Sequence, residues 1–304
     1  MTSLLQHAKR LFGRLSLLED KVDRVQRALA RIELHLQDLR GLDDPSDREM
    51  QVSSQWGEDG ILQALVRKVP LGRRRFVEFG VEDYREANTR FLLQNDNWSG
   101  LVMDGSAANV ERIALDPISW RHDLTSRCAF ITRENVNDLM REHGFSDDLD
   151  LLSIDVDGND YWIWEAVSAT PRIVVVEYNS VFGSSLACTV PYRADFSRTT
   201  AHSSNLYYGA SAAALEQLGT KRGYRLVCGN RAGNNLFFVR EDVAGDLPRR
   251  TAAEAWVASR FREARGPQGV LLHTRAEAAR HLIDKLALVD VITGRSFTLQ
   301  DRSR

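Results

Sequence analysis

Between residues 4 and 39, the apolar positions of the chain recur at alternating intervals of four and three. Such spacing, kept over about five heptads, predicts one long helix with a narrow apolar seam, which is typical of a coiled coil. If Leu15 is assigned to heptad position a and Leu18 to position d, a parallel pairing brings Arg14 beside Glu19 of a second copy. An antiparallel pairing would instead bring basic residues together, so the parallel arrangement is favoured.

Residues 1–42 are therefore expected to form a coiled-coil helix through which the chain self-associates. Gly41 supplies a C-terminal cap and Pro45, shortly after it, prevents the helix from continuing. Leucine at position a mixed with β-branched residues at d leaves dimer, trimer and tetramer open. The alternative interpretation is a helix that packs on the following domain of its own chain.

From about residue 50 the pattern changes to short apolar runs separated by amphipathic segments. The apolar runs predict strands over residues 75–80, 100–104, 128–132, 151–155 and 172–177. Strands that alternate with helices in this way predict an α/β fold with a Rossmann-like, doubly wound and mostly parallel sheet. Two later runs, at 224–228 and 236–240, predict a C-terminal antiparallel hairpin, so this domain is expected to span residues 50–245.

Residues 246–304 are rich in arginine and alanine and are expected to form an accessory element. Helices are predicted over residues 251–264 and 275–286. A small hairpin that turns at Thr293-Gly294 is predicted over residues 289–299.

Composition narrows the classes of protein that fit these 304 residues. Lys and Arg number 40 against 42 Asp and Glu, and this net charge of -2 argues against a strongly basic nucleic-acid binder. The three cysteines are widely spaced and form no C-x-x-C pair, which argues against a disulfide framework or a cysteine-rich zinc site. No apolar run approaches the roughly 18 residues of a membrane-spanning helix, so a cytoplasmic location without a membrane span is expected.

Four acidic residues coincide with the ends of predicted strands, namely Glu78, Asp104, Asp155 and Glu177. In a doubly wound sheet, ligands bind beyond the carboxyl ends of the strands, near the point where the strand order reverses. Acids on several neighbouring strands would meet at that edge, so we expect them to form one site.

The first strand ends in Glu78-Phe79-Gly80, and Asp104 ends the second strand 26 residues after Glu78. An E-x-G strand end followed by a helix is typical of class I S-adenosylmethionine-dependent methyltransferases, because the glycine lets the backbone pass close to the cofactor. The first acid then meets the ammonium group of the cofactor, and the second accepts hydrogen bonds from its ribose. Neither G-x-G-x-x-G nor G-x-x-x-x-G-K-[ST] occurs, which disfavours NAD-type and P-loop binding.

Several sequence blocks extend this interpretation. In order along the chain they are SQWGEDG at 54–60, FVEFG at 76–80, LVMDGS at 101–106, DLLSIDVDGNDYWIW at 150–164 and VVVEYNSVFG at 174–183. Together they resemble bacterial FkbM-like class I methyltransferases, which are often associated with surface-glycan or secondary-metabolite biosynthesis. The resemblance covers about residues 50–240. In one departure, Glu82 occupies the position where many methyltransferases have a second glycine.

The resemblance implies S-adenosyl-L-methionine as methyl donor and a hydroxyl, on a sugar, as acceptor. It also implies that the segment before the first strand lies near the cofactor. The expected cofactor-binding residues are Gln55, Glu58, Glu78, Gly80, Asp104, Gly105, Ser106 and Asp155.

The densest polar cluster follows the fourth strand and consists of Asp155, Asp157, Asn159 and Asp160. Oxygen donors at this density suit Mg²⁺ or Ca²⁺, and Glu177 on the next strand completes a predicted site of Asp155, Asp157 and Glu177. Such a metal would lower the pKa of an acceptor hydroxyl. Two alternatives are a metal-free general base among these carboxylates and a cluster that merely caps the following helix.

The remaining site residues are expected around the acceptor. Asn159, Tyr178 and Asn179 are predicted to bind it. His202, in a polar loop, is a candidate base beside the catalytic candidates Asp155, Asp157 and Glu177.

The sequence therefore favours an S-adenosylmethionine-dependent O-methyltransferase that acts on a glycan or a glycosylated metabolite. One alternative treats Asp155-x-Asp157 as the metal-binding motif of a nucleotide-sugar glycosyltransferase. Another is a methyltransferase-like scaffold without turnover, which the departure at Glu82 keeps open.

Overall fold

The computed structural model describes residues 2–273, 275, 278 and 280–302. The chain divides into two units, residues 1–43 and 44–304. The first unit is a single helix, α1 (Thr2–Leu39), as the heptad pattern predicts. Gly41 follows it with a φ of 63°, the left-handed conformation that commonly terminates helices.

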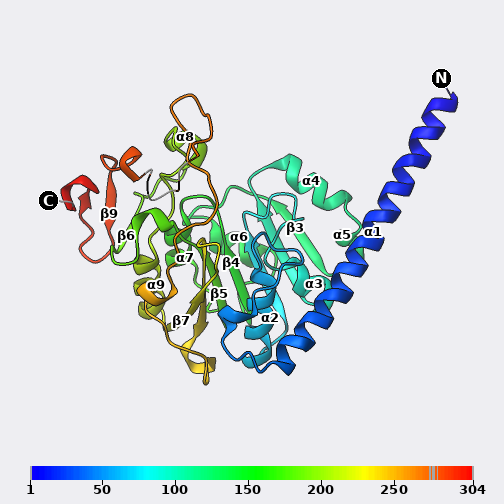
Figure 1. Ribbon diagram of the computed structural model, residues 1–304, viewed down its shortest axis with the longest axis horizontal. Coiled ribbons are helices and arrows are strands. Elements are labelled where there is room, and N and C mark those ends of the chain that lie inside the picture. Colours follow the sequence, from blue (N-terminus) through cyan, green and yellow to red (C-terminus); the bar gives the residue numbers. More distant parts are fainter. Residues whose placement is uncertain (1, 274, 276–277, 279, 303–304) are drawn as a thin grey trace. The chain divides into compact units, whose positions relative to one another are not determined.

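The second unit is built, within the described residues, around a seven-stranded sheet of order β3-β2-β1-β4-β5-β8-β7 (Figure 1). Its strands are β1 (Arg75–Phe79), β2 (Ser99–Asp104), β3 (Leu124–Cys128), β4 (Leu151–Ile154), β5 (Ile173–Glu177), β7 (Tyr224–Gly229) and β8 (Asn235–Arg240). Strand β8 runs antiparallel to both of its neighbours, and the other pairs are parallel. This arrangement confirms the predicted α/β fold with a mostly parallel sheet and an antiparallel hairpin.

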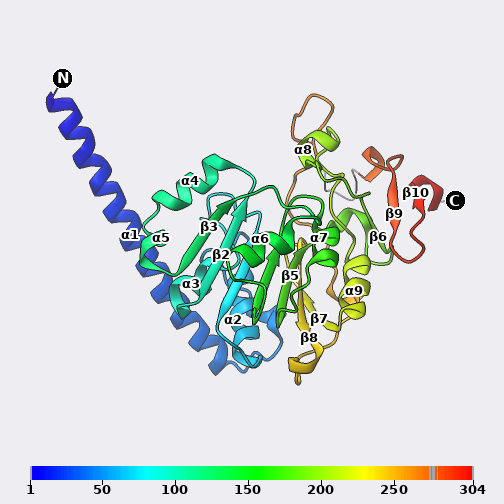
Figure 2. The same cartoon turned by 180° about the vertical axis from the view of Figure 1, so that it is seen from behind.

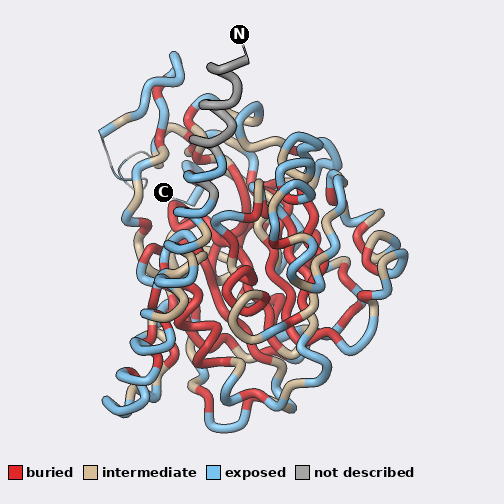
Figure 3. Tube along the Cα trace, turned by 90° about the vertical axis from the view of Figure 1, so that its right-hand side faces the viewer, coloured by how far each residue is buried: buried red, intermediate tan, exposed pale blue. Residues whose placement is uncertain are grey.

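Helices cover both faces of this sheet (Figures 1 and 2). They are α2 (Glu58–Lys68), α3 (Arg90–Asp96), α4 (Ala107–Leu115), α5 (Ile118–Arg121), α6 (Val136–Glu142), α7 (Asp160–Ala166), α9 (Ala212–Lys221) and α10 (Ala252–Ala255). Helix α8 (Arg198–Ala201) packs in a separate cluster. Successive residues of a strand point to opposite faces. Phe76 therefore packs with α2 and α3, whereas Val77 packs in a second core with α6, α7 and α9. The central strands are buried along their length (Figure 3).

The strand order reverses beside β1. From β1 the chain adds β2 and then β3 on one side, and it returns to place β4 on the other. Gly80 directly follows β1 and lies beside the end of β4. The two backbones are so close that a Cβ atom on Gly80 would lie 1.5 Å from the carbonyl oxygen of Asp155. With a φ of 75°, Gly80 also has a backbone that side chains disfavour.

Two predictions of secondary structure are wrong. The third strand is Leu124–Cys128 and ends where the predicted strand 128–132 begins. The helix predicted over residues 251–264 is limited to α10 (Ala252–Ala255). Beyond α10 the chain forms tertiary instead of helical hydrogen bonds. The Tyr178 hydroxyl bonds both N and O of Val257, and Ser259 N–H donates to Ser180 Oγ.

The C-terminal segment contributes, in its described part, two strands to a three-stranded sheet of order β10-β9-β6. Strands β9 (Leu288–Asp290) and β10 (Ser296–Phe297) form the predicted hairpin. Strand β6 (Cys188–Thr189), which was not predicted, pairs with β9. Of the helix predicted over residues 275–286, the structure describes one short 3₁₀ turn, Arg280–Leu282, and the prediction lies partly outside the described residues.

None of the described helices combines the length with the apolarity needed to traverse a bilayer.

Candidate functional site

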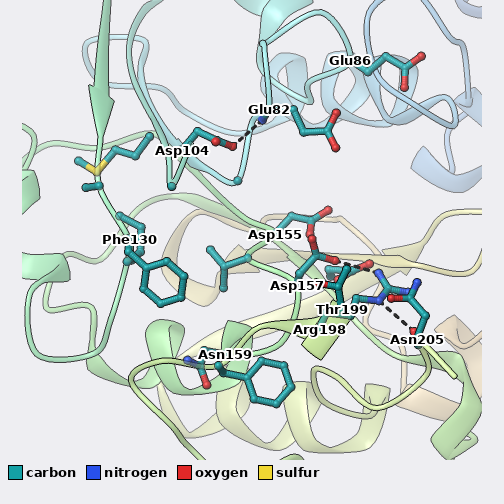
Figure 4. Close-up of a pocket in the computed structure, with 18 of the residues that line it drawn as sticks. Glu82, Glu86, Asp104, Phe130, Asp155, Asp157, Asn159, Arg198, Thr199 and Asn205 are labelled. Atoms are coloured by element: carbon teal, nitrogen blue, oxygen red, sulfur yellow. Dashed lines mark hydrogen bonds and ion pairs between the residues drawn. The ribbon is translucent and has the colours of Figure 1, made fainter. Parts of the chain in front are cut away.

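A pocket of about 670 Å³ lies at the carboxyl ends of the parallel strands, beside the reversal of strand order (Figure 4). Gly80 lines it from the end of β1, Asp104 from β2, Asp155 from β4 and Glu177 from β5. The pocket lies where a doubly wound sheet binds its ligands. Three of the four strand-end acids therefore line one cavity, whereas Glu78, which was expected to join them, does not.

Asp155, Asp157 and Glu177, which we call the acidic cluster, each offer one carboxylate oxygen within 4.8 Å of the others. Glu177 is buried, and its Oε2 has no hydrogen-bond partner among the described residues. Burial, and next the charge of Asp157, raises the pKa of Asp155 well above its ordinary value. Burial and the charge of Asp155 raise the pKa of Glu177 in the same way.

The acidic cluster fits a hard divalent cation. All of its donors are carboxylate oxygens, which Mg²⁺ and Ca²⁺ prefer. The unpartnered Oε2 of buried Glu177 is a group whose burial costs free energy until something binds it. A cation would also relieve the repulsion that raises the pKa of Asp155 and of Glu177.

Arg198, the first residue of α8, is a positively charged neighbour of the acidic cluster (Figure 4). Its side chain is only 12% exposed, and its Nη1 donates to Asp157 Oδ1 at 2.9 Å. Its Nη2 pairs with Glu263, its Nε donates to the Asn205 carbonyl at 3.1 Å, and its Cζ lies 3.5 Å from the centroid of the Tyr208 ring. Sequence reasoning missed Arg198, because it lies in a segment without a motif or clear periodicity.

Asp104 forms the opposite wall of the pocket. Its Oδ2 accepts the backbone N–H of Glu82 at 2.8 Å, and its Oδ1 accepts Ser106 N–H and Asn109 Nδ2. A carboxylate can accept about four hydrogen bonds, so Oδ2 retains capacity for one more donor. Glu82 adopts a φ of 48°, so the loop keeps the left-handed conformation that a glycine would favour.

Glu78 and Glu58, by contrast, lie outside the pocket lining. The carboxylate of Glu78 accepts Asn88 N–H and both N–H and Oγ1–H of Thr89, at 2.5–3.1 Å. Glu58 is buried and accepts the side-chain amides of Asn230 and Asn235. Both carboxylates hold together neighbouring segments of the fold.

The other predicted site residues also fall into two groups, those that line the pocket and those that lie outside its lining. Gln55, Gly105 and Asn159 line the pocket, and Asn159 Oδ1 is buried without a hydrogen-bond partner among the described residues. Outside the lining, Ser106 caps α4, and Asn179 binds the carbonyls of residues 206 and 208.

Tyr178 and His202 also lie outside the lining. The Tyr178 hydroxyl bonds the backbone of Val257, and His202 Nδ1 lies 2.8 Å from Ser204 Oγ.

The capping alternative for the polar cluster receives no support from hydrogen bonding. Asn159 occupies the N-cap of α7, but its side chain forms no cap hydrogen bond and instead donates to the Arg193 carbonyl. Asp160 accepts the N–H groups of Val156 and Gly158, which folds the loop before the helix. Asp157, with a φ of 56°, faces the pocket from that loop.

Several lining residues were not predicted, namely Glu82, Glu86, Phe130, Phe196, Arg198, Asn205 and Arg265. Phe130 illustrates the reason. A strand over residues 128–132 would have placed Phe130 inside the sheet, whereas the observed end of β3 at Cys128 leaves it at the pocket, 52% exposed. A correct strand boundary would have shown that an aromatic residue follows the carboxyl end of β3.

No protein-family model and no curated protein matches the chain. Similar solved structures include the N-terminal domain of EvdMO1 with SAH bound, with a TM-score of 0.39 and 14% identity over 64% of this chain and 79% of that chain. A S-adenosylmethionine-dependent methyltransferase from Clostridium acetobutylicum ATCC 824 has a TM-score of 0.32 and 14% identity, over 45% and 56%. M. capricolum TrmK in complex with S-adenosyl-homocysteine has a TM-score of 0.36 and 8% identity, over 58% and 66%. The fold class of this chain follows from its own strand order.

Proposed function

We propose that the chain is an S-adenosylmethionine-dependent O-methyltransferase that acts on a hydroxyl of a glycan or glycosylated metabolite. One observation carries the proposal. A single pocket at the reversal of strand order has Asp104 on one wall and the acidic cluster on the other. One wall suits a nucleoside and the other suits a metal-bound or deprotonated hydroxyl.

The cofactor would lie along the wall formed by the ends of β1 and β2. Oδ2 of Asp104 retains capacity for one ribose hydroxyl. The side chains of Met103, Phe130 and Ile131 offer an apolar surface for the adenine ring. Gly80 and Gly105 leave room for the cofactor because neither carries a side chain.

The acceptor would lie over the acidic cluster. A divalent cation held by Asp155, Asp157 and Glu177 would lower the pKa of the acceptor hydroxyl. Without a cation, the raised pKa of Asp155 or Glu177 suits either residue as the general base. Asn159 Oδ1 is available to accept a second hydroxyl of the acceptor. Because the sulfonium donor is already activated, alignment and deprotonation of the hydroxyl are the main tasks.

Calorimetric titration with S-adenosylhomocysteine, with and without Mg²⁺, tests the proposal. We expect a Kd in the micromolar range for the unmodified protein and loss of binding in Asp104→Ala. Asp242→Ala is the matched control. Asp242 pairs with Arg240 at the end of β8, which lies beside the amino end of β5 and therefore away from the pocket. Binding of uridine diphosphate with Mg²⁺ in place of S-adenosylhomocysteine would instead support a glycosyltransferase. Binding of neither would support a scaffold without turnover.

We further propose that α1 associates with a second copy of itself as a parallel coiled coil. Its heptad seam presents seven consecutive apolar side chains whose exposed fractions are 47–71%, namely Leu18, Val22, Val25, Leu29, Ile32, Leu36 and Leu39. Seams of this kind bury their side chains in a partner helix of the same pattern. The parallel direction is supported by the pairing of Arg14 with Glu19 that it allows. The seam residues before Leu18 lie outside the described side chains.

Sedimentation equilibrium of the full chain tests this association. Leu29→Asp places a charge on the seam, and we expect it to convert the oligomer to a monomer. Leu17→Asp is the control, because Leu17 is 63% exposed but lies off the seam, and it should leave the oligomer intact. An unmodified chain that is monomeric at tens of micromolar would show that the seam does not mediate self-association.

A further inference from the structure

Asp157 is the member of the acidic cluster that the fold holds least firmly. Its side chain is 64% exposed and projects from a loop residue with a φ of 56°, whereas Glu177 ends a buried strand. An exposed aspartate normally samples several rotamers, and ordering such a side chain costs free energy. Something must fix Asp157 if it is to act together with Asp155 and Glu177.

Arg198 can fix the side chain of Asp157 in this way. Its contacts with Glu263, Asn205 and Tyr208 hold the guanidinium in place independently of Asp157. The remaining contact, from Nη1 to Asp157 Oδ1 at 2.9 Å, therefore joins a fixed donor to an exposed acceptor. Only Oδ1 of Asp157 receives this bond, so Oδ2 can serve as a ligand.

We propose that Arg198 is a positioning residue that fixes Asp157 toward Asp155 and Glu177 and thereby assembles the cation site. The inference rests on the cation proposed above for this cluster. It also gives Glu263, far along the chain, a role: Glu263 accepts from Arg198 and from the Tyr208 hydroxyl, and so keeps the guanidinium in place. Hydrogen bonds to a ligating carboxylate commonly change metal affinity by about 10- to 100-fold.

The sign of one measured effect distinguishes positioning from simple charge balance. Titration of Mn²⁺, followed by the paramagnetic resonance of the free ion, gives its Kd without any acceptor or turnover. If Arg198 positions Asp157, Arg198→Gln binds Mn²⁺ at least tenfold more weakly, although a positive charge near the site has been removed. If Arg198 only balances charge, the same variant binds Mn²⁺ more tightly.

Further variants separate geometry from charge and from folding. Arg198→Lys keeps the charge without the planar fork, so we expect an affinity between those of the unmodified protein and Arg198→Gln. Glu263→Gln leaves both partners of the Arg198–Asp157 bond in place, and we expect a loss of about threefold. Arg193→Gln removes an exposed arginine of the same segment, paired only with Asp195 among the described residues, and should leave the Kd unchanged.

The outcomes are decisive even if one variant fails to fold. Circular dichroism identifies such a variant, and Arg198→Lys and Glu263→Gln then carry the test. Tighter or unchanged Mn²⁺ binding in the folded variants overturns the positioning role. Absence of Mn²⁺ binding in the unmodified protein overturns it as well, together with the proposed cation. Titration with S-adenosylhomocysteine decides the methyl-donor site separately.

Discussion

Strands β1 and β5 each carry a buried glutamate near the carboxyl end, but the two carboxylates differ in their hydrogen bonding. Glu78 is the next-to-last residue of β1 and Glu177 the last residue of β5, and their side chains are 5% and 6% exposed. Glu78 is saturated by hydrogen bonds from Asn88 and Thr89, whereas Glu177 keeps an oxygen without a partner among the described residues. The first carboxylate stabilises the fold, and the second is available to a ligand.

This difference shows that burial alone does not identify a functional carboxylate. A buried carboxylate is costly unless donors surround it, and a fold that supplies those donors uses the group as a structural link. A fold that withholds them leaves an oxygen free to accept a proton or a ligand. Burial raises the pKa of both carboxylates, but hydrogen bonds from Thr89 and Asn88 oppose the rise at Glu78, whereas the pKa of Glu177 lies well above its ordinary value. The sheet of this protein contains both cases, separated by the width of β4.

The largest expected effect is a difference in stability between two identical substitutions. Glu78→Gln turns an amide NH₂ toward donors that need an acceptor, so we expect the free energy of unfolding to fall by about 3 kcal/mol. Glu177→Gln deprives no N–H group of the described residues of an acceptor and should change the free energy of unfolding by less than about 1 kcal/mol. Urea denaturation measures both. Equal losses of stability at the two positions would mean that Glu78 stabilises the fold no more than Glu177 does.

Asp59 provides an intermediate case. Its Oδ2 accepts the N–H groups of residues 52, 53 and 54, while its Oδ1 has no partner among the described residues. Burial raises the pKa of Asp59 to about 6 from its ordinary 3.8, although hydrogen bonds, first that from Ser54 N–H, oppose the rise.

The folded protein therefore retains a proton on Asp59 between pH 4 and 6 that the unfolded chain releases, and its stability falls as the pH rises through this window. Relative to Asp59→Asn, we expect a loss of about 2 kcal/mol between pH 4 and pH 6. Parallel stability curves for the two proteins would show that the hydrogen bonds to Oδ2 outweigh burial.

The smallest effect concerns binding rather than folding. Glu177→Gln removes a charged donor from the acidic cluster, so we expect Mn²⁺ affinity to fall at least tenfold, equivalent to about 1.4 kcal/mol. Glu78→Gln, outside the pocket lining, should leave Mn²⁺ affinity unchanged in the folded protein. Comparable losses in both variants would mean that the two strand ends are not functionally distinct.

The sequence was sufficient to predict the fold class, because the spacing of apolar residues indicates the order of strands and helices. Strand–helix alternation located the central strands, and the heptad spacing located α1. Periodicity failed where tertiary contacts override local preference, as in the segment after Ala255, which bonds Tyr178 and Ser180 instead of continuing a helix.

The site was only partly predictable. Strand ends placed Asp104, Asp155 and Glu177 in one pocket, because parallel strands share an edge. The same argument could not separate Glu78 from Glu177, since it does not show that the loop at residues 88 and 89 folds back to donate to Glu78. Nor could it find Arg198, whose partners are brought together only by folding.

The contact between Gly80 and the Asp155 carbonyl has a practical consequence for redesign of the pocket. Because even a methyl group at residue 80 would collide with the Asp155 carbonyl, the ends of β1 and β4 must stay in direct contact at this point. A redesign of the pocket should therefore keep Gly80 and diversify Glu82 and Glu86, the exposed side chains of the adjoining loop. Substitutions at those two positions would change the lining of the pocket without disturbing the contact between the ends of β1 and β4.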